Sequence, residues 1–284
     1  MKAGFWVAPE GEDAAMTVMP IGPEPPLRAR KLNFLATSSA QEMIRRCRRT
    51  AMLLPELADA LAVQKADRPG RLFDITDFPD DDKELIAQTL GEGEGEVAGV
   101  AALANGITAR MQEAVMAGVW RVRFTDGEGR LIADYVEVAS IPAAVKQACS
   151  ALPISISHGP APTGAMNVMP VLTEIGDRIA RYSDGDPGHI ITFSLFPMSP
   201  EDMAFLQETL GVGPVQLTSR GYGTCRIVVT GTRNVWSVQF YNAMDTIILD
   251  TLEICDIPSV AIAAEVDFRD SQARLREIEE AYFK

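Results

Sequence analysis

Val235-Trp236-Ser237-Val238-Gln239-Phe240 repeats the pattern of Val119-Trp120-Arg121-Val122-Arg123-Phe124, and the two tryptophans are 116 residues apart. Each stretch leads, 22 residues after its tryptophan, to an Ile-Pro pair, at Ile141-Pro142 and at Ile257-Pro258. In both stretches apolar residues alternate with polar or charged ones, which is the pattern of a half-buried strand. A fixed internal spacing of this kind indicates a tandem repeat, and the repeat decides the fold of the whole chain.

The repeat extends upstream of the tryptophan strands. Pro69–Pro79 aligns with Pro187–Pro197, and Gln88–Gly91 aligns with Glu208–Gly211. The spacing between matched residues drifts by a few positions here, which indicates short insertions or deletions in loops. Two copies of one domain therefore account for most of the chain, and each copy has a usual domain size.

Both copies have the same order of expected elements: a strand after a Pro-Gly pair, a helix, about four closely spaced strands, and a short helix. Strands joined by such short connections pair antiparallel. The predicted fold is α+β, with tandem repeats at about 50–150 and 165–266, each an antiparallel sheet of four to five strands carrying helices on one face. The full predicted organisation is a flexible tail at 1–38, the first repeat with a leading helix at 39–150, a Pro/Gly linker at 151–166, and the second repeat with a C-terminal helix at 167–284. This pattern leaves open whether the repeats form one body or two domains.

The composition is that of an ordinary globular chain: 284 residues, 47% hydrophobic and 23% charged. Its net charge of −13 argues against nucleic acid or an anionic membrane as the main partner. That charge suits a basic partner, although solubility explains it equally well. No apolar run approaches 18 residues, so we expect no direct membrane insertion, and Met1–Phe5 do not begin a secretory signal. We expect a cytoplasmic protein.

The residue types that carry chemistry are sparse, and we predict no catalytic residue, no metal site and no cofactor. The four cysteines are widely spaced without a CxxC motif, and neither histidine has neighbours that would complete a triad or a metal site. Four arginines flank Cys47; they would lower the pKa of an exposed thiol, but the preferred interpretation turns Cys47 toward the core. The residues concerned are Cys47, Cys149, Cys225, Cys255, His158 and His189.

Two aspartates lie on the apolar side of predicted strands. Asp134 and Asp250 alternate in step with valines, leucines and isoleucines, and an acid on an apolar face needs a partner. We expect each to form a structural pair, with Arg121 or Arg233 as the candidate partner, rather than to act in catalysis.

Two loops are candidates for partner binding. Arg220-Gly221-Tyr222-Gly223, with Cys225 close behind, concentrates side chains suited to recognition: Arg220 for a carboxylate or backbone carbonyls, and Tyr222 for stacking. A tight turn between two strands is the alternative interpretation. The second loop alternates glycine with Glu92, Glu94 and Glu96, whose charges would repel phosphate, so we interpret it as a flexible acidic loop.

Several longer motifs occur in a fixed order between residues 50 and 282. They are Leu90–Val97, Gln112–Arg123, Ser219–Gly223, Thr232–Trp236, Glu253–Pro258 and Ala263–Asp267. With these motifs the chain resembles the hydrogenase expression/formation proteins of the HupH/HyaF type. The first motif departs from the expected Leu-Gly-Glu-Gly-Glu-Val by one extra Gly-Glu unit, which affects loop length only.

The resemblance implies a non-enzymatic accessory chaperone in the maturation of an uptake NiFe hydrogenase. Such a chaperone acts on the precursor of the small, iron–sulfur subunit before its export and assembly, and protects its clusters together with a thioredoxin-like maturation factor. The partner-binding residues that we expect are Arg220, Gly221, Tyr222, Gly223, Cys225, Arg233, Trp236, Trp120, Glu92, Glu94 and Glu96. We further hypothesise that the acidic surface receives the basic twin-arginine signal segment of the precursor. The alternative function is that of a small cysteine-dependent redox or metal-handling protein that uses Cys47, Cys225 or Cys255.

Overall fold

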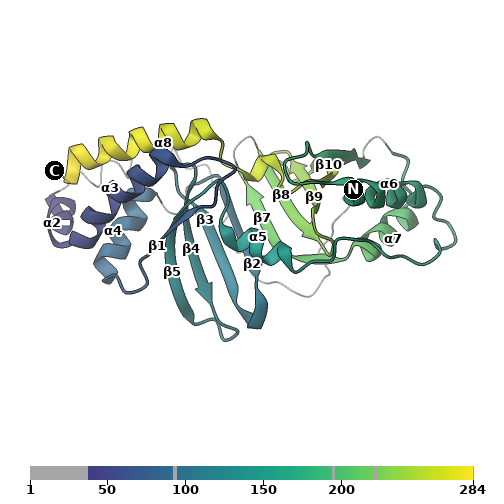
Figure 1. The fold of residues 1–284 in the computed structure, drawn as a ribbon, viewed down its shortest axis with the longest axis horizontal. Coiled ribbons are helices and arrows are strands. Elements are labelled where there is room, and N and C mark those ends of the chain that lie inside the picture. Colours follow the sequence, from purple (N-terminus) through teal and green to yellow (C-terminus); the bar gives the residue numbers. More distant parts are fainter. Residues whose placement is uncertain (1–37, 92–94, 194–195, 221–222, 284) are drawn as a thin grey trace.

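The computed structural model describes residues 38–91, 95–193, 196–220 and 223–283. Within these residues the strands form one ten-stranded antiparallel sheet, with helices at both ends and over its centre (Figure 1). The strand order is β1-β5-β4-β3-β2-β7-β8-β9-β10-β6. Helices together with an antiparallel sheet confirm the predicted α+β class.

The elements of the first half alternate helix and strand before a run of four strands. They are α2 (Ser38–Arg46), α3 (Arg48–Val63), β1 (Arg71–Asp74), α4 (Asp80–Leu90), β2 (Val97–Ala102), η1 (Ala104–Gly106), β3 (Thr108–Glu113), β4 (Val119–Thr125), β5 (Leu131–Val138) and α5 (Ala143–Ser150).

The second half repeats this order from α6 onward. Its elements are α6 (Val168–Arg181), β6 (His189–Thr192), α7 (Pro200–Leu210), β7 (Val212–Ser219), β8 (Thr224–Thr230), β9 (Val235–Tyr241), β10 (Ile247–Ile254), η3 (Ser259–Ala261), α8 (Glu265–Ile278) and η4 (Glu279–Phe283).

The two halves meet at the pairing of β2 with β7, which runs from Val97 opposite Ser219 to Ala101 opposite Val215. Gly99 lies in the middle of this seam. A Cβ atom at Gly99 would lie 2.3 Å from the Leu217 side chain and 2.6 Å from the Gln216 carbonyl oxygen. Glycine therefore permits the close approach of the two strands, and the halves share one sheet instead of forming a sheet each.

Helices cover both faces of the sheet, so the prediction that they lie on one face is wrong. Val119 packs in one core cluster with α3, α4 and α8, whereas its neighbour Trp120 packs in another with α5. Successive side chains of a strand point to opposite faces, which places these helices on opposite sides of β4. The alternating pattern suggested a half-buried strand because Arg121 is charged, but Arg121 is only 6% exposed.

Local sequence determines where the helices begin. Ser199 and Asp202 form a capping box at the start of α7, with Pro200 as its first residue. Asp202 also accepts a 2.9 Å hydrogen bond from the Val168 backbone at the start of α6. In the first half Asp82 accepts a 2.8 Å bond from the Thr50 backbone near the start of α3. A buried aspartate thus joins two successive helices in each half.

The last helix, α8, packs back on the first half. Its Phe268 and Leu275 belong to the core cluster that also contains Leu54 and Leu57 of α3, and Figure 1 shows α8 lying along α3. The helix α5 contacts both β2 and β7 and therefore covers the seam. In the described part of the chain, no helix is both long and apolar enough to cross a lipid bilayer.

Candidate partner-binding pocket

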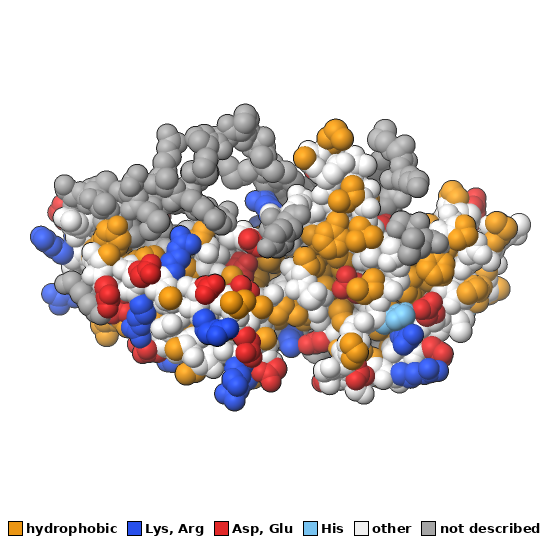
Figure 2. Space-filling view, turned by 90° about the horizontal axis from the view of Figure 1, so that it is seen from above, with side chains coloured by type: hydrophobic (Ala, Val, Ile, Leu, Met, Phe, Trp, Pro, Cys, Tyr) orange, Lys and Arg blue, Asp and Glu red, His pale blue; other side chains and the backbone are white. Residues whose placement is uncertain are grey.

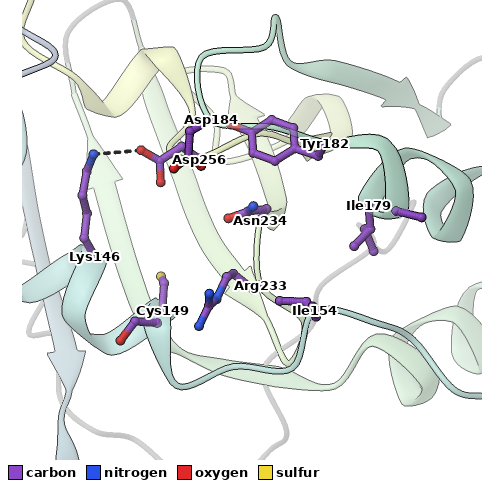
Figure 3. A pocket seen from close by; sticks show the side chains of 11 residues that line it. Lys146, Cys149, Ile154, Ile179, Tyr182, Asp184, Arg233, Asn234 and Asp256 are labelled. Carbon is purple, nitrogen blue, oxygen red and sulfur yellow. Dashed lines mark hydrogen bonds and ion pairs between the residues drawn. The ribbon is translucent and has the colours of Figure 1, made fainter.

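A pocket of about 430 Å³ lies between α5 and the C-terminal end of α6, and we call it the α5–α6 pocket. This volume falls within the range of roughly 300–1,000 Å³ typical of ligand sites. In Figure 3 the lining side chains come from α5 on one side, from the end of α6 on the other, and from the turn before β9 between them. The lining residues are Lys146, Cys149, Ser150, Ile154, Ile179, Ala180, Tyr182, Asp184, Arg233, Asn234 and Asp256.

Backbone contacts place the turn before β9 at the base of the pocket. The Arg233 N–H donates to the Pro153 carbonyl at 2.8 Å, and the Asn234 carbonyl accepts from the Cys255 N–H at 3.0 Å. Asn234 has a φ of 63°, in the left-handed region that asparagine tolerates better than most residues. These bonds connect the linker, the turn before β9 and the end of β10.

The buried tryptophan of β9 holds the backbone of Asp256, which lines the pocket. The Trp236 indole N–H donates to the Asp256 carbonyl at 3.0 Å. The Asp256 carboxylate then accepts from the Lys146 ammonium of α5 at 2.8 Å, and this pair closes one side of the pocket (Figure 3). Both side chains of the pair are about half exposed, so the pair orients the rim but contributes at most about 1 kcal/mol.

The pocket carries charges of both signs and one thiol. Arg233 and Lys146 are basic, and Asp184 and Asp256 are acidic. The Nε of Arg233 is buried and has no hydrogen-bond acceptor among the described residues, and Arg233 lines the pocket, where its guanidinium supplies a positive charge. Burial, reinforced by Asp256 and opposed by Arg233, raises the pKa of Cys149 to about 12. A thiol that stays protonated is a poor nucleophile, and the arrangement is therefore suited to binding.

One described residue of each predicted loop lies at one end of the β2–β7 seam. The Arg220 N–H donates to the Glu96 carbonyl at 2.8 Å, and both residues are exposed. Gly223 follows with a φ of 118°, a conformation that favours glycine. Glu92, Glu94, Gly221 and Tyr222 lie outside the described residues. The structure thus brings Arg220 and Glu96 together, at the β2–β7 seam and outside the α5–α6 pocket.

Three residues expected to contact a partner are part of the core. Trp120 and Trp236 are 0% exposed, and Cys225 is 2% exposed. Their surfaces are covered by α5 and the neighbouring strands, so they cannot touch a partner on the folded protein. The indole N–H groups of both tryptophans donate to backbone carbonyls inside the core.

Asp134 forms the expected pair with Arg121, whereas Asp250 has a different neighbour from the one expected. Arg121 donates to both carboxylate oxygens of Asp134, at 2.5 and 2.6 Å. Asp250 accepts a weak 3.4 Å bond from Gln239. Arg233, the other proposed partner, lies in the α5–α6 pocket.

Several pocket residues belong to no motif that the sequence analysis recognised. Asp256 lies inside a recognised motif, but Lys146, Cys149 and Tyr182 belong to segments without one. They come together only because α5 and α6 flank the turn before β9. An alignment of the two repeats marks the turn, since Arg233-Asn234 replaces Ala117-Gly118, but it does not indicate what surrounds it.

The remaining cysteines and histidines have structural surroundings. Cys47 is fully buried, as preferred, and its pKa is raised by burial and by nearby aspartates despite the opposing effect of Arg46. Burial also raises the pKa of Cys225 and of Cys255 to about 12. Across the described ranges, no group of three or more His, Cys, Asp or Glu side chains is placed to hold a metal ion.

This α+β architecture, with two similar halves sharing one sheet and a polar pocket beside the seam, can be compared with known proteins. The model of the HupH hydrogenase expression protein C-terminal conserved region matches residues 49–158 and again residues 165–282. The hydrogenase expression/formation protein HupH of Rhizobium leguminosarum bv. viciae is 88% identical over the full length of both chains. HoxQ of Azotobacter vinelandii is 43% identical over 81% of this chain and 80% of its own. HyaF, a hydrogenase-1 operon protein of Escherichia coli K12, is 34% identical over 79% of this chain and 74% of its own.

These matches show that the chain belongs to the HupH hydrogenase expression protein family. Both matched segments begin near the first long helix of a half and end beyond its last strand. Arg233, Asn234 and Asp256 lie within the second segment, and Lys146 and Cys149 within the first. The α5–α6 pocket is therefore built from both segments.

Proposed function

We propose that this chain is a non-enzymatic accessory chaperone for the maturation of an uptake NiFe hydrogenase. It binds the precursor of the small, iron–sulfur subunit before export and assembly, and it acts together with a thioredoxin-like maturation factor. The main support for this proposal is membership of the HupH family, because a hydrogenase expression/formation protein is 88% identical to this chain over its whole length. We infer in addition that the two halves are copies of one ancestral repeat.

The chemistry of the described residues supports binding over catalysis. The α5–α6 pocket offers a guanidinium donor, an ion pair on its rim and apolar walls, all suited to a polypeptide surface. The redox alternative needs an accessible thiol with a low pKa, and burial raises the pKa of all four cysteines. The chaperone function is therefore the better supported of the two.

The surface charge supports a weaker form of the electrostatic hypothesis. The chain has a net charge of −13, but on the face seen in Figure 2 basic side chains lie among the acidic ones. A basic signal segment is then attracted by the overall field, which raises the association rate at low salt. We assign the specific contacts with the precursor to the α5–α6 pocket and to the loop at Arg220.

Co-purification from cells that make the hydrogenase subunits tests the proposed function. We expect the small-subunit precursor to co-purify with the unmodified chain, and less of it to be retained by Arg220→Ala, which changes an exposed side chain beside Glu96. Arg269→Ala on α8 is the matched control, because it removes another exposed arginine, one outside both predicted loops. Recovery of no hydrogenase subunit with the unmodified chain contradicts the proposal.

The same preparation tests the contribution of the signal segment. Deletion of the signal peptide from the precursor, or an increase in salt, should weaken the complex mainly by slowing association. If complex formation is unchanged by both, the electrostatic hypothesis is wrong while binding of the precursor stands.

A further inference from the structure

The last helix of the chain covers a turn of the first half that has a counterpart in the second. Gly118, just before the Val-Trp pair of β4, has a φ of 82°, and the Phe268 ring of α8 lies directly over it. A Cβ atom at Gly118 would come within 2.4 Å of that ring. The Ser271 hydroxyl donates to the Ala117 carbonyl at 2.9 Å. Phe268 and Ser271 are three residues apart and therefore lie on one side of α8, and this side packs onto the Ala117-Gly118 turn.

The matching turn in the second half lies at the base of the α5–α6 pocket. Arg233-Asn234 precedes the second Val-Trp pair as Ala117-Gly118 precedes the first, and Asn234 shares the left-handed conformation of Gly118. The backbone contact is also shared: the Gly118 carbonyl accepts from Ala139, and the Asn234 carbonyl accepts from Cys255, both at 3.0 Å.

The helices beside the two turns match as well. In the first half α8 packs along α3, which ends at Val63; in the second half α6, the counterpart of α3, ends at Arg181 and forms one wall of the pocket. After α5 the chain does not continue as a long helix like α8. It runs as a turn and irregular backbone through Pro153 and Ile154, and this leaves a space of about 430 Å³ over Arg233-Asn234.

We propose that the α5–α6 pocket binds a helical segment of the small-subunit precursor, which inserts an aromatic or long aliphatic side chain over the Arg233-Asn234 turn. In this complex the segment would pack on the Arg233-Asn234 turn as α8 packs on the Ala117-Gly118 turn. The proposal rests on the proposed function for the identity of the partner, and it assigns the place and the mode of binding.

The differences between the two turns fit an external partner. Asn234 carries a Cβ where Gly118 has none, so the inserted side chain lies further from the backbone than Phe268 does, and the pocket has the volume for it. Ile154, which is 66% exposed, and Ile179 supply apolar contact on one side. The guanidinium of Arg233, which lines the pocket, can meet a carbonyl or carboxylate of the segment, a contact that Ala117 cannot make.

Filling the pocket tests the proposal without disturbing the core. Ala180 is exposed, lines the pocket, and is the next-to-last residue of α6, so Ala180→Trp places an indole in the space proposed for the partner. Ala62→Trp is the matched control, since Ala62 is exposed and is the next-to-last residue of α3. Ser150→Trp, from an exposed residue on the opposite wall, is a second blocking variant. Each variant is first checked for an unchanged melting temperature, and its affinity for the small-subunit precursor is then measured with the full-length chain.

We expect both blocking variants to weaken binding by about thirtyfold or more, as loss of a central anchor does, and Ala62→Trp to bind as the unmodified chain does. If the blocking variants fold normally and keep full affinity, the pocket is not the binding site, although the proposed function stands. If the unmodified chain itself does not bind the precursor, the proposed function and this assignment are both wrong.

Discussion

The buried ion pair between Arg121 and Asp134 gives the sharpest prediction about stability. Arg121 is 6% exposed and Asp134 is 2% exposed, and two hydrogen bonds join them. Replacing Arg121 by Met leaves the Asp134 carboxylate buried without its main partner. Removing one member of a buried pair costs about 3–5 kcal/mol, and the loss of two hydrogen bonds to a charged group gives a similar estimate of about 3–6 kcal/mol.

A double-mutant cycle isolates the interaction between the two side chains. Arg121→Met with Asp134→Leu removes both charges, so we expect the double variant to be more stable than Arg121→Met alone. Arg123→Met is the matched control: its guanidinium lies 3.9 Å from the same carboxylate but is 42% exposed, and we expect a loss of about 1 kcal/mol or less. Urea denaturation followed by circular dichroism provides the free energies of unfolding.

Two outcomes refute this reasoning. One is an Arg121→Met variant that loses no more stability than Arg123→Met does. The other is a double variant whose loss equals the sum of the two single losses, because that result means the charges do not interact.

Three further predictions follow from other buried groups. Burial raises the pKa of Glu113 and of Glu137 to about 7 from the ordinary 4.5. Between these two pH values the folded state holds more protons than the unfolded state, so the free energy of unfolding falls as the pH rises. Glu137→Gln removes one of the two groups and should reduce this fall by about 3 kcal/mol. A pH profile unchanged by Glu137→Gln contradicts this. Gly99→Ala should destabilise the β2–β7 seam by about 1–3 kcal/mol because of its Cβ contacts, whereas Gly127→Ala, whose Cβ meets only one atom at 3.9 Å, should not; equal melting temperatures for both variants would disprove the seam argument. The thiols of Cys149 and Cys225 should react with iodoacetamide at pH 7.5 far more slowly in the folded than in the unfolded chain, and rapid labelling of the folded protein would revive the redox function.

Local patterns predicted much of the secondary structure. The two alternating stretches around Trp120 and Trp236 form β4 and β9, and they pair antiparallel with their neighbours as their short connections predicted. These elements depend on contacts between near neighbours in the chain, which a single sequence contains. The pairing of Arg121 with Asp134 was also predictable, because an acid in step with apolar residues needs a partner.

Long-range packing decided where the two tryptophans and Arg233 lie, which the local patterns did not indicate. A tryptophan in an alternating strand has the same pattern whether it packs inside or binds a partner, and the structure buries Trp120 and Trp236 completely. Likewise, Arg233 was expected to pair with an aspartate in a strand, but its turn lies against the linker and α5. Residues more than 80 positions apart meet there, such as Lys146 and Asp256, and no local spacing encodes that meeting.

The sequence by itself determined the repeat, the α+β class, the principal strands and the family, because each depends on residue order and short-range periodicity. Only the tertiary structure decided that the halves share one sheet, that helices cover both of its faces, and that α8 returns to the first half. Each of these depends on which apolar surfaces meet, such as Gly99 against Leu217 and Phe268 over Gly118. The α5–α6 pocket is a consequence of the same packing, since α8 covers one of two matching turns and the irregular chain after α5 leaves room over the other.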